Sequence, residues 1–107
     1  MYKYFKEEEI IGLKPELVDM LDRAREIAET AFVITSGLRT LEHNKEVGGV
    51  EDSAHLTGEA VDIACVNSQR RFRIVKALLD VGFRRIEIRP THIHCDIDET
   101  KVQDVIF

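Results

Sequence analysis

Two strand-like runs near the C-terminus constrain the fold most, RRIEIR (84–89) and HIHCDID (92–98), and only Pro90 and Thr91 separate them. Both runs alternate polar and apolar residues, which is typical of a strand with one buried face. A connection this short joins neighbouring strands as an antiparallel pair. The chain is therefore expected to contain an antiparallel sheet with one apolar face and one polar face.

Two amphipathic helices are expected earlier in the chain. KPELVDMLDRAREIAET (14–30) has Pro15 near its start, which suits a first helical turn, and its apolar residues recur at helical spacing. SQRRFRIVKALLDVGF (68–83) has Ser68 as its expected N-cap and Gly82 as its stop. Its residues expected to point inward are Phe72, Val75, Leu78 and Leu79.

The order of these elements predicts the fold class. Further strands are expected in AFVITSG (31–37) and EAVDIACV (59–66), with an edge strand in VQDVIF (102–107). Thr40 can cap a short helix over 41–47. Helices early and in the middle, with mostly antiparallel strands at the end, predict an α+β domain whose helices pack on one face of the sheet.

Length and composition limit the domain organisation and the partners. The 107 residues are enough for a single domain, 1–107, and a hydrophobic content of 44% with 33% charged residues indicates a globular protein. A net charge of −5 argues against a nucleic-acid partner. No run approaches the roughly 20 apolar residues of a membrane span, and the N-terminus does not resemble a signal peptide. We expect a monomer that is cytoplasmic as synthesised.

Asp62 is an unusual residue for its position in EAVDIACV (59–66). Alternation along this strand places Val61, Ile63 and Cys65 on the apolar face and Asp62 on the opposite face, between two alanines. A carboxylate in an otherwise apolar strand is costly unless it is paired or bound to a cation. Either a buried arginine or a metal ion would supply that partner.

Histidines near acidic residues are the other candidate ligands. His92, His94 and Asp96 share the polar face of HIHCDID, and His55 lies upstream of Asp62. Two imidazoles and one carboxylate, with water in the remaining position, form a common catalytic zinc arrangement.

Two neighbouring residues have alternative expected roles. Asp96 can hydrogen-bond the second nitrogen of a ligand histidine, or pair with an arginine such as Arg84 or Arg89. Ser53 can orient His55 or touch a substrate, or it can serve as the hydroxyl of a helix cap or turn.

Five motifs extend over most of the chain in the order SGLRT (36–40), Asn44, VGG (47–49), SAHLTGEAVDI (53–63) and HIHCD (92–96). Together they resemble the zinc D-Ala-D-Ala carboxypeptidase family, peptidase family M15, whose core is shared with the Hedgehog signalling domain. The resemblance implies a zinc ion, Zn²⁺, held by His55, Asp62 and His94. It also implies that Arg39 contacts the substrate or polarises the scissile carbonyl, with Ser53 as a further substrate-binding candidate.

The general base departs from the pattern of many family members, which place a glutamate three residues before the last zinc histidine. Thr91 occupies that position, and a threonine cannot take up the proton. The carboxypeptidase branch carries a histidine near its last ligand, so His92, on the same face as His94, is the candidate base or transition-state stabiliser. Glu87 is the alternative if the Pro90 turn folds it across the site, although an exposed salt bridge is the simpler interpretation of Glu87.

Two functions follow from the resemblance. The first is a zinc peptidase that acts on peptidoglycan stem peptides, as a D,D-carboxypeptidase or an L-Ala-D-Glu endopeptidase, and that reaches the wall through phage lysis or virion delivery. The second is a non-catalytic metal-binding module with a structural or partner-binding role. A third interpretation, chance polar residues on an α+β scaffold, predicts no stoichiometric metal.

Overall fold

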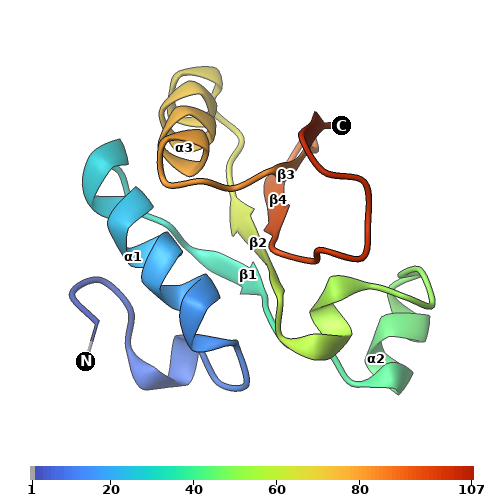
Figure 1. The fold of residues 1–107 in the computed structure, drawn as a ribbon. Coiled ribbons are helices and arrows are strands. Elements are labelled where there is room, and N and C mark those ends of the chain that lie inside the picture. The colour runs from blue at the N-terminus through green and yellow to red at the C-terminus, as the bar shows by residue number, and fades with distance from the viewer. Residues whose placement is uncertain (1) are drawn as a thin grey trace.

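A computed structural model describes residues 2–107 and contains one five-stranded sheet (Figure 1). The strands lie side by side in the order β1-β2-β4-β3-β5, and each neighbouring pair is antiparallel except β3 and β5, which are parallel. The tight turn at Pro90 and Thr91 joins β3 to β4, so the expected hairpin is confirmed. The strands are β1 (Ile34–Ser36), β2 (Ala60–Ala64), β3 (Arg85–Ile88), β4 (His92–Asp96) and β5 (Val105–Ile106).

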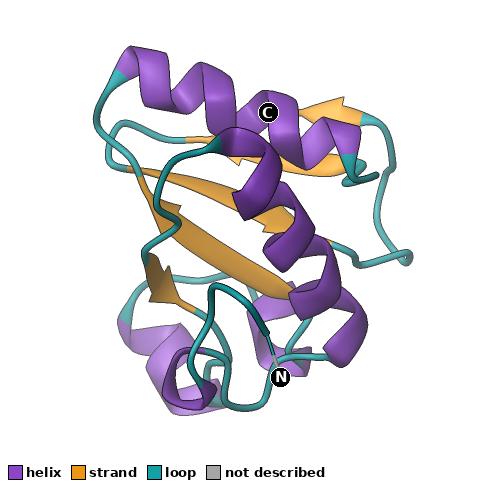
Figure 2. Cartoon of the chain, turned by 90° about the vertical axis from the view of Figure 1, so that its left-hand side faces the viewer, coloured by secondary structure: helices purple, strands orange, loops and turns teal. Residues whose placement is uncertain are grey.

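Two long helices cover one face of the sheet. Helices α1 (Pro15–Ala28) and α3 (Ser68–Asp80) pack against each other, and Figure 2 shows both in front of the strands. The expected α+β class, with helices on one face, is confirmed. The remaining helices are short and lie in the connections: η1 (Glu7–Glu9), α2 (Leu41–Glu46) and η2 (Ala54–Thr57).

The apolar face of the sheet forms the core with these two helices. Val61, Ile63, Ile93 and Cys95, at alternate positions of β2 and β4, are completely buried. They belong to one cluster with residues of both helices, among them Leu17, Leu21, Ile74 and Leu78. Burying a side chain of this size contributes about 1.5 to 3 kcal/mol. The strand residues between them must point to the opposite face, away from α1 and α3.

The prediction of which α3 residues point inward is partly wrong. Phe72 is 69% exposed and Leu79 is 48% exposed, whereas Ile74, Ala77 and Leu78 are buried. Each residue turns a helix by about 100°, so Phe72, two positions before Ile74, points away from the sheet. The helix is also capped one residue earlier than expected, because the Asn67 side chain accepts the hydrogen bond from the Arg70 backbone N–H.

The helices found within residues 2–107 are all too short or too polar to cross a lipid bilayer.

The turn between β4 and β5 is organised by Asp98. Its carboxylate accepts hydrogen bonds from the backbone N–H and the hydroxyl of Thr100, at 3.0 and 2.6 Å, and from Lys101 Nζ at 2.6 Å. Its carbonyl accepts a further bond from Gln103 Nε2. Burial by itself raises the pKa of the Asp98 carboxyl, but the bonds from Lys101 and Thr100 outweigh burial and lower the pKa to about 2.

Replacing this carboxylate, Asp98→Asn, is expected to lower the free energy of unfolding at pH 7 by about 1 to 2 kcal/mol. The folded pKa of about 2 lies below the ordinary 3.8, so ionised Asp98 stabilises the fold above about pH 4. That contribution is lost as the pH falls toward 2. Urea unfolding at several pH values measures it, with Asp80→Asn, in the exposed pair with Lys76 on α3, as the control. A stability difference that stays constant from pH 7 to pH 3 would contradict the assignment.

Candidate metal centre

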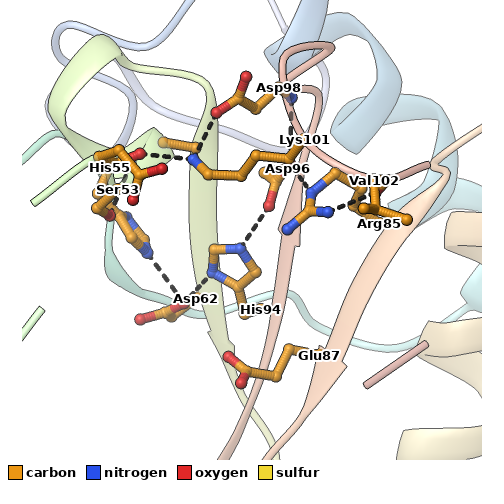
Figure 3. A network of polar contacts seen from close by, with 12 residues as sticks. Ser53, His55, Asp62, Arg85, Glu87, His94, Asp96, Asp98, Lys101 and Val102 are labelled. Atoms are coloured by element: carbon orange, nitrogen blue, oxygen red, sulfur yellow. Dashed lines mark hydrogen bonds and ion pairs between the residues drawn. The ribbon is translucent and has the colours of Figure 1, made fainter. Parts of the chain in front are cut away.

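Three potential metal ligands meet on the polar face of the sheet. His55 comes from η2, Asp62 from the middle of β2 and His94 from the middle of β4. Asp62 Oδ1 lies 3.2 Å from His55 Nε2 and 3.1 Å from His94 Nδ1 (Figure 3). One ligand atom from each residue lies within 4.8 Å of the other two. The three residues predicted as metal ligands are therefore brought together.

Strand register brings two of them together. Asp62 and His94 stand directly opposite each other in the antiparallel β2–β4 pair, so their side chains emerge side by side on the same face. The flanking pairs, Val61 with Cys95 and Ile63 with Ile93, are buried on the other face. A register shift of one residue would move the ligands into the core, so burial of the apolar pairs maintains the site.

His55 is held by the short helix η2. The Ser53 hydroxyl caps this helix by accepting the His55 backbone N–H at 3.2 Å. Gly58 ends it with a φ of +75°, and a Cβ at this position would lie 2.2 Å from the Gly12 carbonyl oxygen. Glycine is thus needed here both for the left-handed conformation and for the close approach of the backbone.

The second nitrogen of each histidine is also engaged. His55 Nδ1 lies 2.8 Å from the Gly37 carbonyl oxygen, which can only accept, so Nδ1 carries the hydrogen and Nε2 faces Asp62. His94 Nε2 lies 2.7 Å from Asp96 Oδ2, and its Nδ1 faces Asp62. Metal-binding histidines ordinarily have this kind of oxygen partner on the nitrogen that does not bind the metal.

Asp96 has both of the roles that the sequence left open, but with a different arginine. Its Oδ1 accepts a hydrogen bond from Arg85 Nε at 2.9 Å, while Oδ2 contacts His94. The two expected partners pair elsewhere, Arg84 with Asp104 and Arg89 with Glu87. Arg85 lies directly opposite Asp96 in the β3–β4 register, which no local pattern identifies.

The charges of Asp62 and His94 depend on each other. Burial alone raises the pKa of Asp62, but its close contacts with the His55 and His94 rings outweigh burial and hold this pKa well below its ordinary value. Burial alone lowers the pKa of His94, but hydrogen bonds to Asp62 and Asp96 and their charges raise it to about 9. Without a metal, His94 is therefore protonated at neutral pH, and a divalent cation would displace that proton.

This donor set fits a zinc ion. Two imidazole nitrogens and one carboxylate oxygen are ligands that zinc accepts, and three protein ligands leave a position for water or substrate. The three side chains converge, are largely shielded from solvent, and carry their supporting hydrogen bonds. The His–Asp–His group could therefore hold a metal.

Arg39 lies beside the three ligands. Its Nη2 is 3.3 Å from Asp62 Oδ2, so its positive charge faces the carboxylate from the side of β1. Its Nε donates to Ser36 Oγ at 3.1 Å and its Nη1 to Asn44 Oδ1 at 3.3 Å. Asn44, only 1% exposed, is itself held by a bond from its Nδ2 to the Val50 carbonyl. The guanidinium is therefore fixed in orientation at the edge of the site.

Both candidate bases are neighbours of His94 in the sheet, His92 two residues earlier on β4 and Glu87 opposite it on β3. His92 Nε2 is 4.0 Å from Asp62 Oδ2. Glu87 stands opposite His94 in the β3–β4 register, on the same face of the sheet (Figure 3). It forms a salt bridge to Arg89 at 2.9 Å, but its side chain is only 22% exposed. Glu87 is therefore a residue of the site and of a salt bridge at once.

A single open cleft covers these groups. It contains the three ligands and Arg39, and its further lining includes Ser53, Glu87, His92, Arg85, Lys101 and Phe107. Ser53 is thus placed at the cleft, with its oxygen engaged by His55. Sequence reasoning missed the last three residues. Alternation along β3 could have placed Arg85 on the polar face with Glu87, but nothing local indicates that Lys101 and Phe107 fold back to the cleft.

Comparisons with known proteins identify the fold and the family. The fold is similar to the crystal structure of Serratia marcescens L-Ala D-Glu endopeptidase ChiX, with a TM-score of 0.63 and 21% sequence identity. The similarity covers 92% of this chain and 90% of that chain. Among curated proteins, none matches the chain. A family model described as peptidase M15 matches residues 3–96, which include all three candidate ligands, and the chain therefore belongs to the peptidase M15 family.

Proposed function

We propose that this chain is a zinc-dependent peptidase that hydrolyses amide bonds in the stem peptides of bacterial peptidoglycan. The observation that carries the proposal is the convergence of His55, Asp62 and His94 in one cleft, with Arg39 beside them. Membership of a peptidase family supports hydrolysis as the reaction. The non-ligand groups of the cleft supply the other functions that amide hydrolysis needs.

The zinc ligands and Arg39 have separate roles in the proposed hydrolysis. His55, Asp62 and His94 would hold the zinc ion, which supplies Lewis-acid polarisation of the scissile carbonyl and activation of water. Arg39 is oriented by Ser36 and Asn44 and donates to the oxygen that becomes negative as water attacks.

His92 is the proposed general base. It would take a proton from the attacking water and deliver it to the leaving amine. Its Nε2 lies near Asp62, at the cleft, and its side chain is partly open to solvent. Glu87, opposite His94 on β3, is the competing candidate.

We propose an endopeptidase that cuts between L-Ala and D-Glu rather than a D,D-carboxypeptidase. The support is the similar Serratia marcescens structure, which is named an L-Ala D-Glu endopeptidase and extends over nearly the same length. Ser53, at the cleft, remains the candidate for a further substrate contact through its hydroxyl hydrogen. Delivery by phage lysis or by a virion, and the monomeric state, stay predictions.

The test combines metal analysis with digestion of purified peptidoglycan and muropeptides. We expect about one zinc ion per chain and release of stem-peptide fragments that stops when a chelator removes the metal and resumes when zinc is restored. A product whose L-Ala carries a newly free carboxylate, with a second product whose D-Glu carries a free amine, would support the endopeptidase. Release of D-Ala would reassign the bond to a carboxypeptidase. Stoichiometric zinc without cleavage of any wall fragment would overturn the peptidase.

The second candidate is a non-catalytic metal-binding module of the same fold. The observation that favours it is Thr91, which occupies the position where many relatives carry a glutamate. Its hydroxyl contacts only the neighbouring His92 ring, at 3.4 Å, among the side-chain hydrogen bonds found within residues 2–107. Zinc binding without hydrolysis in the digest above is the outcome that this candidate predicts.

A further inference from the structure

A line of contacts connects the ligand His94 to the C-terminal segment 97–107, which lies beyond the region matched by the family model. His94 Nε2 contacts Asp96 Oδ2 at 2.7 Å, and Asp96 Oδ1 accepts from Arg85 Nε at 2.9 Å. The backbone N–H of Asp98 donates to the same Oδ1 at 3.1 Å. The orientation of the His94 ring therefore depends on a carboxylate that is held from its other side.

Arg85 is held in turn by the C-terminal segment. Its Nη1 donates to the Val102 carbonyl, and its guanidinium carbon lies 5.2 Å from the centre of the Phe107 ring (Figure 3 shows the Val102 contact). The chain around Phe107 is fixed to β3, because Phe107 N–H donates to the Ile86 carbonyl and Ile88 N–H to the Phe107 carbonyl, both at 2.8 Å. The segment thus closes over Arg85 and leaves it only 9% exposed.

The same segment also reaches the other side of the cleft. Lys101 Nζ donates both to Asp98 and to the backbone carbonyl of Asp52 (Figure 3). Asp52 directly precedes Ser53, which caps the helix that carries His55. Contacts from 97–107 therefore support the surroundings of both histidine ligands.

The physical reason that Arg85 matters is the burial of Asp96. A buried carboxylate without an opposite charge is unfavourable, and removing one partner of such a pair leaves the other uncompensated. Asp96 would then turn away from His94 or draw other groups toward itself. An imidazole that loses its oriented partner is a weaker and less well-placed ligand.

We propose that Arg85, held in place by the C-terminal segment 97–107, is a positioning residue for His94 and sets how tightly the site holds zinc. The inference rests on the proposed zinc site. It assigns a role to a part of the chain that supplies none of the three ligands.

The test measures zinc affinity of the full-length chain by competition with a chelator of known affinity. Arg85→Met is expected to weaken zinc binding by about 10- to 100-fold, the range found when such supporting partners of a ligand are lost. Arg73→Met is the matched control, because Arg73 is exposed on α3, on the other face of the sheet from the ligands, and its zinc affinity should equal the wild type. Arg85→Lys keeps the charge and should recover part of the affinity.

A spectroscopic measurement separates positioning from general loss of structure. With Co²⁺ in place of zinc, the visible absorption band of Arg85→Met should shift relative to the wild type, while that of Arg73→Met should not. If Arg85→Met does not fold, Phe107→Leu decides, because it removes the ring next to Arg85 and should weaken zinc binding in the same direction.

Each outcome has a defined meaning. The inference fails if folded Arg85→Met binds zinc as tightly as the wild type or more tightly. Where Arg85→Met does not fold, it fails if Phe107→Leu binds zinc with unchanged affinity. Either result leaves the proposed peptidase intact. A wild-type protein that binds no zinc would overturn the proposed function, and the inference with it.

Discussion

Asp62→Ala is expected to abolish stoichiometric zinc binding and peptidase activity together. The Asp62 carboxylate lies between the two histidines, with one oxygen within 3.2 Å of His55 Nε2 and 3.1 Å of His94 Nδ1. Four ligands in small zinc sites provide about 10 to 16 kcal/mol, so the loss of one should weaken zinc binding roughly 100- to 1,000-fold. Metal analysis after dialysis and the muropeptide digest measure the two losses separately.

Two further variants test whether the losses come from the missing ligand. Asp80→Ala removes a carboxylate that forms an exposed pair with Lys76 on α3. This helix lies on the other face of the sheet from the ligands, so the change should leave zinc content and activity unchanged. Asp62→Asn keeps the size of the side chain and an oxygen donor, so its zinc affinity should lie between that of the wild type and that of Asp62→Ala. Retention of one zinc ion per chain by Asp62→Ala would contradict the ligand assignment.

His92→Ala is expected to lower kcat by about 10²- to 10⁴-fold, the usual contribution of a general acid–base group, without loss of zinc. His92 is not among the three converging ligands, but its Nε2 lies 4.0 Å from Asp62 Oδ2 at the open side of the cleft. Glu87→Gln, on β3 opposite His94, should lower kcat less than about tenfold. Single-turnover hydrolysis with zinc content determined on the same sample checks both variants.

The reverse order of effects would assign the base to Glu87. Glu87 is a competing base because its carboxylate lines the same cleft, where it also forms a salt bridge to Arg89. Loss of zinc in either variant would instead indicate an additional ligand. The proposal for His92 therefore fails if its replacement leaves kcat near the wild-type value.

Local sequence patterns were enough to predict the two faces of the sheet and to place Asp62 and His94 on the polar face. The period of two in EAVDIACV and HIHCDID sets Asp62 and His94 on the face opposite Val61 and Ile93, and the structure confirms this alternation. The pattern is reliable because one face of each strand must be buried, and a slip of one residue would expose the whole apolar set. His55 was found through the resemblance to the family rather than through any period.

Other expectations failed where the answer depends on how elements pack. Phe72 and Leu79 are apolar and lie on a helix, but the rotation of α3 against the sheet leaves both exposed. Glu87 forms the salt bridge expected of it, with Arg89, but only the β3–β4 register places it beside His94 as well. Helix rotation and strand register are set by contacts between segments, which neighbouring residues in the sequence do not specify.

By itself, the sequence of this protein determined the α+β class and the polar face of the sheet that carries Asp62 and His94, because burial enforces short-range periodicity within each strand. Only the tertiary structure decided that Asp96 pairs with Arg85 and that Lys101 and Phe107 return to the cleft. These contacts join residues from different strands and from the C-terminal segment. They form only when the chain folds back on itself, so no local pattern contains them.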